Sequence, residues 1–67
     1  MFNINMINGL LLLARLYPSS EATTYDNSVF FEIKVEDIQD ISREDIQLLE
    51  DWGWRVTESE DLQVWDW

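Results

Sequence analysis

The side chains of this sequence that could do chemistry are almost all carboxylates. Fourteen of its 67 residues are Asp or Glu, and the chain contains neither Cys nor His. It therefore lacks thiol nucleophiles, an imidazole base and the commonest zinc ligands. Paired carboxylates could serve as acid and base, but they need a pocket, and a chain this short barely fills its own core. The sequence predicts a non-enzymatic protein without a cofactor or metal.

One segment, residues 40–45, spaces side-chain oxygens at its first, third and fifth positions in the manner of a calcium loop. Its sixth position is Asp45, where that loop requires Gly. Ser42 followed three residues later by Asp45 instead resembles a capping box, and Ile41 and Ile46 can form the apolar pair of a hydrophobic staple. We therefore interpret the segment as the start of a helix.

The charge of the chain is large and unevenly distributed. The net charge is −10, and residues 21–67 hold all fourteen acids, whereas residues 1–20 hold one base and no acid. Four basic residues cannot form a patch that follows phosphates, so direct binding to nucleic acid is not expected, and anionic membranes are repelled. The same field favours a basic protein partner. The alternative that the acidity serves only solubility stays open.

The carboxylates occur in short runs. Spaced carboxylates on a rigid scaffold can imitate the phosphates of a duplex and occupy the Lys/Arg groove of a nucleic-acid-binding protein. The alternative for any single carboxylate is a solvated helix face. We predict a partner-binding surface made of these carboxylates and of the terminal tryptophan: Glu36, Asp37, Asp40, Glu44, Asp45, Glu50, Asp51 and Trp67.

These side chains need a scaffold, and its first expected element is a helix over residues 5–17. Asn3 or Asn5 can cap it, and Pro18 ends it. Leu12 is expected on the solvent face. The face toward the core is expected to carry apolar residues at helical spacing, namely Met6, Leu10, Leu13 and Tyr17.

The rest of the chain reads as two hairpins separated by a second helix. Residues 21–25 and 29–35 form the first hairpin, since the second of these segments alternates apolar and polar residues. Residues 42–52 form the helix, and residues 54–58 and 62–67 form the second hairpin. The sequence thus predicts one domain over residues 1–67, of α+β class, with order α-β-β-α-β-β and two helices on one face of an antiparallel sheet of about four strands.

All four tryptophans lie in the last sixteen residues. A small chain without disulfides or metal must fill its core with large side chains or associate with another chain. We expect Trp52, Trp54 and Trp65 in the core. Trp67 is the last residue, where chains usually fray. We therefore expect it to be partly exposed and to pack against a second subunit or the target.

Surplus apolar groups at Leu12, at Phe30 and on one face of the last strand also favour a homodimer. The apolar run at residues 9–14 is far shorter than the roughly 20 residues that a membrane span needs. No basic segment precedes this run. No membrane association is expected, and the sequence is interpreted as cytoplasmic.

In character, the chain resembles small phage-encoded antagonists of host defence, anti-CRISPRs among them, which are short, acidic, Cys-free domains. The pattern LYP … VFFEIKV … SREDIQLLEDWGW … VWDW is also similar to small phage proteins that end in a Gly-Trp and a tryptophan-containing hairpin. The resemblance implies an inhibitor in the host cytoplasm that occupies a basic nucleic-acid-binding surface of a defence complex, and it carries over no functional residue. The alternative is a small homo-oligomeric structural or accessory protein.

Overall fold

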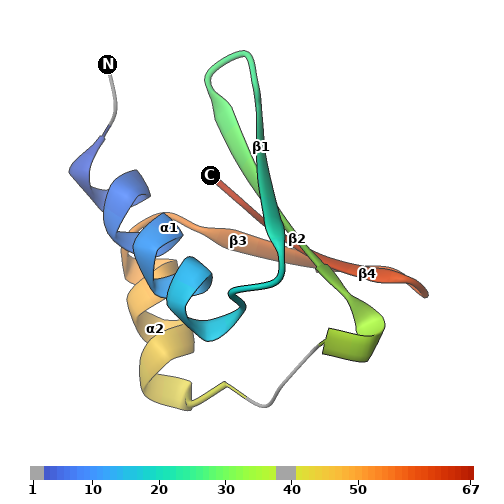
Figure 1. Ribbon diagram of the computed structural model, residues 1–67. Coiled ribbons are helices and arrows are strands. Elements are labelled where there is room, and N and C mark those ends of the chain that lie inside the picture. The colour runs from blue at the N-terminus through green and yellow to red at the C-terminus, as the bar shows by residue number, and fades with distance from the viewer. Residues whose placement is uncertain (1–2, 38–40) are drawn as a thin grey trace.

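The computed structural model describes residues 3–37 and 41–67 (Figure 1). Both helices lie on the same side of an antiparallel sheet, so the predicted α+β class and order of elements are confirmed. The elements in chain order are α1 (Ile4–Leu16), β1 (Glu21–Tyr25), β2 (Ser28–Lys34), the 3-10 turn η1 (Val35–Asp37), α2 (Arg43–Asp51), β3 (Arg55–Glu58) and β4 (Leu62–Asp66).

The two hairpins join side by side into one sheet. The strand order is β1-β2-β4-β3, so β2 and β4 form the centre and β1 and β3 are the edges. Phe31 pairs with Trp65, which pairs in turn with Val56 on β3. Because paired residues share a face, the helix-facing side of the sheet carries Val29, Phe31, Ile33 and Trp65, all of them buried.

Helix α1 begins at the first of the two expected caps, because the side chain of Asn3 accepts a hydrogen bond from the backbone N–H of Asn5 at 2.8 Å. The expectation that Leu12 faces solvent is wrong, since it is only 6% exposed. Its neighbour Leu11 is 63% exposed instead. The physical reason is that α1 packs against two neighbours, the sheet and α2, and Leu12 lies on the side toward α2.

Helix α2 follows the predicted capping pattern. The side chain of Ser42 accepts a hydrogen bond from the backbone N–H of Asp45 at 3.1 Å. Gly53 then ends the helix with a φ of 91°, a left-handed conformation that glycine adopts without strain. Within the helix, Leu49 is the residue that the core buries fully.

The core is built around two tryptophans. Trp54 and Trp65 are 1% and 3% exposed, which confirms their expected burial, whereas Trp52 is only half-buried against the core. Trp54 lies directly against the backbone of α1 at Gly9, where a Cβ atom would overlap its indole ring. Val56, in contrast, is exposed although it shares the helix-facing side with Trp65.

Trp67 is partly exposed, as expected, but it is held by the fold and does not fray. Its backbone N–H donates to the carbonyl of Val29 at 2.9 Å, and its carbonyl accepts from the N–H of Val29 at 3.0 Å. The indole Nε1 donates to the carbonyl of Trp52 at 2.7 Å. These bonds extend the β2–β4 ladder and tie the half-buried ring to the end of α2.

Candidate interaction surface

The carboxylates predicted on α2 do not form one face. Glu44, Glu50 and Asp51 are exposed and Asp45 is half-buried. Glu50 lines a hollow beside Trp54 and β3, whereas Asp45 lines a separate groove between the two helices. Asp51 accepts a hydrogen bond from the side chain of Gln47 at 2.9 Å, one helical turn away. The helix therefore presents its carboxylates to two sides of the molecule.

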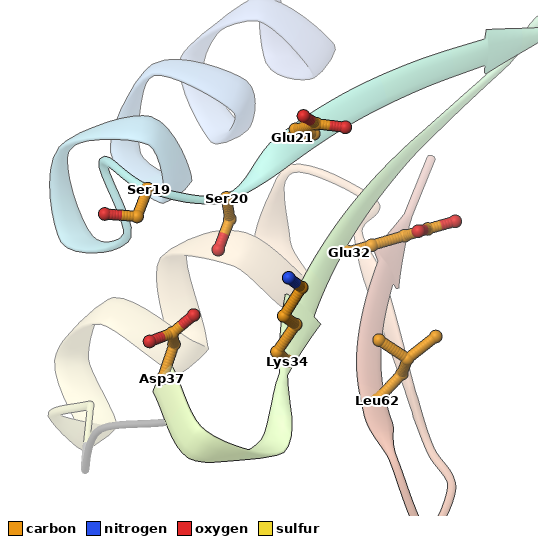
Figure 2. Close-up of a pocket in the computed structure, with 7 residues that line it drawn as sticks. All are labelled: Ser19, Ser20, Glu21, Glu32, Lys34, Asp37 and Leu62. Atoms are coloured by element: carbon orange, nitrogen blue, oxygen red, sulfur yellow. The ribbon is translucent and has the colours of Figure 1, made fainter.

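The carboxylates predicted before α2 lie near a different part of the sheet. Glu36 and Asp37 are exposed on η1, and Asp40 lies outside the described residues. Asp37 lines a hollow on the sheet face opposite the helices, and Figure 2 shows that its lining comes from the loop after α1, β1, β2, η1 and β4. The lining residues are Ser19, Ser20, Glu21, Glu32, Lys34, Asp37 and Leu62.

This hollow contains two carboxylates that the sequence did not single out. Glu21 and Glu32 are directly paired in the register of β1 and β2, an arrangement that destabilises a hairpin when both side chains are charged. Lys34 lies two residues further along β2 on the same face and supplies one compensating charge. Among the described residues, no cluster of three or more Asp, Glu, Cys or His side chains is arranged to hold a metal ion.

A groove between α1 and α2 has an exposed leucine on each wall. Leu11 is exposed on one wall and Leu48, at 40% exposure, on the other, with Trp52 half-buried beside them. The full lining is Asn8, Leu11, Leu12, Arg15, Asp45, Leu48 and Trp52. Sequence reasoning missed this groove, because it placed Leu12 in solvent.

Within the described residues, neither helix combines the length and the apolar character that crossing a bilayer requires. A scan against protein-family models, a search of curated proteins and a search of solved structures each find no match for this chain.

Proposed function

We propose that this protein is a non-enzymatic binding protein that recognises a basic, nucleic-acid-binding protein partner. One observation carries the proposal. Apart from the half-buried Asp45 and Asp66, every Asp and Glu side chain in the described part of the chain is exposed. A densely charged and rigid anionic surface of this kind is complementary to a surface of Lys and Arg that normally contacts phosphates.

The chain itself does little to neutralise this surface. The sequence has four basic residues against fourteen acids, and no ion pair within 4.0 Å joins residues of the described ranges 3–37 and 41–67. Such a field raises the association rate with a basic partner and repels nucleic acid. Occupation of a nucleic-acid-binding groove would make the protein an inhibitor of the anti-CRISPR type, acting in the cytoplasm of a host cell on a defence complex.

Affinity capture from a host lysate tests the proposal. The immobilised protein should retain nucleic-acid-binding proteins at low salt and release them as the salt concentration rises, because exposed charge pairs are screened. The identified partner is then purified with its nucleic acid, and addition of the protein should displace a labelled duplex. A partner that keeps its nucleic acid in the presence of saturating protein would contradict the inhibitory function.

Charge reversal locates the surface. A variant of α2 carries Glu44→Lys, Glu50→Lys and Asp51→Lys, and a control with the same change in net charge carries Glu58→Lys, Glu60→Lys and Asp61→Lys. The α2 variant should bind the purified partner roughly tenfold more weakly or worse than the control does, since close charge pairs contribute most to recognition. Equal losses would mean that net charge alone matters and that the α2 carboxylates are not the contact.

A second candidate function is a homo-oligomeric accessory protein, which the edge strand β1 favours. All five of its residues are exposed. Because β1 lies at the edge of the sheet, its outer side offers backbone groups for pairing with a second copy. Sedimentation at micromolar concentration measures this association. Thr24→Pro removes a backbone donor from the outer side of the strand, because Val29, the residue paired with Thr24, directs its own backbone groups to Trp67. This substitution should convert such a dimer to a monomer.

A further inference from the structure

The groove between α1 and α2 is apolar inside and acidic at one rim. We propose that it is the docking site for the apolar face of a basic amphipathic helix on the partner protein. This inference rests on the proposed function for the basic character of the partner. The inference adds that recognition depends on leucines that become buried on binding, as well as on charge.

The shape of the groove matches a helix. Its lining residues on α1 are Asn8, Leu11, Leu12 and Arg15, and those on α2 and its C-cap are Asp45, Leu48 and Trp52. Both sets follow helical spacing over eight residues, so the groove runs along both helices for about two turns, or roughly 10 Å. A partner helix with apolar residues at positions i, i+3 or i+4, and i+7 presents a stripe of the same length.

The apolar part of the groove is already organised. Leu11 and Leu48 are large apolar side chains exposed on facing walls, which is the arrangement that excludes water when a third apolar group inserts between them. The backbone at Trp52 is held in place, because its carbonyl accepts the indole N–H of Trp67. Docking therefore requires little reordering, which lowers the entropic cost of binding.

The charges at the groove select the partner. Glu44 precedes Leu48 by one turn and Asp51 follows it by three residues, so both carboxylates flank Leu48 on the exposed side of α2. Asp45 lines the groove itself, and the base in the lining is Arg15. Lysine or arginine residues that border an apolar stripe complement this rim. A second copy of the chain does not, because each copy carries a net charge of −10.

The test uses a synthetic peptide made only of leucine and lysine, about four turns long, with the leucines on one helical face. The control peptide has the same composition but a sequence order that spreads the leucines around the helix. Both are titrated into the isotope-labelled protein at an ionic strength of about 0.15 M, where long-range charge effects are screened. The amphipathic peptide should bind about tenfold more tightly, with amide shifts at Leu11 and Leu48 and a shift of the Trp52 indole N–H.

Matched substitutions separate apolar docking from simple charge attraction. Leu48 and Val56 are 40% and 42% exposed, and they lie on α2 and on the edge strand β3. Leu48→Gln should weaken binding of the amphipathic peptide about tenfold, the effect expected of a central interface residue. Val56→Gln should leave it unchanged. Leu11→Gln is an independent second variant that should behave as Leu48→Gln does.

Three outcomes would overturn the inference. If both peptides bind equally and neither leucine substitution matters, the groove is not a docking site, while recognition of basic partners by the carboxylates survives. If neither peptide binds, the proposed function fails together with the groove. If sedimentation shows a dimer that Leu48→Gln dissociates, the occupant of the groove is a second copy of the chain and not a basic helix.

Discussion

Helix α1 makes two contacts of opposite character. Toward the sheet, Gly9 allows the ring of Trp54 to lie against the helix backbone, and the contact is closed to solvent. Toward the outer side of α2, Leu11 and Leu48 line an open groove. Both regions combine leucines of the two helices with a tryptophan that follows α2. The difference is whether the chain supplies a partner for the apolar surface.

The apolar residues of the two regions have different roles. Those between the helices and the sheet provide the stability of a chain that has no disulfide. In the groove, Leu11 and Leu48 remain exposed in the folded monomer, so their substitution costs the fold little. Substitutions between the helices and the sheet, the closed side, should therefore reduce the free energy of unfolding. Substitutions of the exposed leucines in the groove, the open side, should reduce binding.

The largest effect is expected for Trp65→Ala on the closed side. The ring is buried at the centre of the sheet between Phe31 and Val56, so its removal leaves a cavity. The expected loss is about 3–5 kcal/mol, enough to unfold a domain of this size. Circular dichroism during a thermal melt measures the loss. A cooperative transition at an unchanged temperature would show that the ring is not part of the core.

Gly9→Ala should have the next largest effect. The added methyl group overlaps the indole of Trp54, which is buried and cannot move away freely. Overpacking of this kind costs about 1–3 kcal/mol. Urea denaturation of this variant and of an Ala14→Gly control separates the clash from helix propensity. Ala14 is exposed on the same helix, and the opposite exchange there should cost only about 1 kcal/mol.

Trp67→Phe tests how firmly the end of the chain is held. The substitution keeps an aromatic ring but removes the N–H that donates to the carbonyl of Trp52. The expected loss is about 1 kcal/mol, the typical net contribution of one such hydrogen bond. Hydrogen exchange at the amide of Val29, whose partner is the carbonyl of Trp67, should become faster. Unchanged exchange would mean that the backbone pairing alone fixes the terminus.

Local interactions explain what could be predicted from the sequence. The start of α2 at Ser42 and its end at Gly53 depend on residues within one turn, and both are confirmed. The position of Trp67 could not be predicted, because its pairing with Val29 depends on which hairpin strands become neighbours.

The interaction surface was also hard to predict from the sequence, because it too depends on which elements become neighbours in the fold. Residues 10–13 are four consecutive leucines, so every side of that turn is apolar, and only the placement of α2 decides that Leu12 is buried and Leu11 exposed. The acidic runs were visible, but their division between the two sides of α2 became clear only from the groove and the hollow beside β3.

The smallest effect on stability is expected on the open side, for Leu11→Gln. Leu11 is exposed in the folded monomer, and surface substitutions of this kind usually change the free energy of unfolding by no more than about 0.5 kcal/mol. Leu12→Gln, one residue along the same helix, is the matched control. Because Leu12 is buried, that variant leaves an unpaired amide inside the protein and should lose about 2–4 kcal/mol. Urea denaturation of the two variants side by side measures the difference. Equal losses would show that α1 is rotated about its axis, so that Leu11 and Leu12 are equally buried and the groove is part of the core.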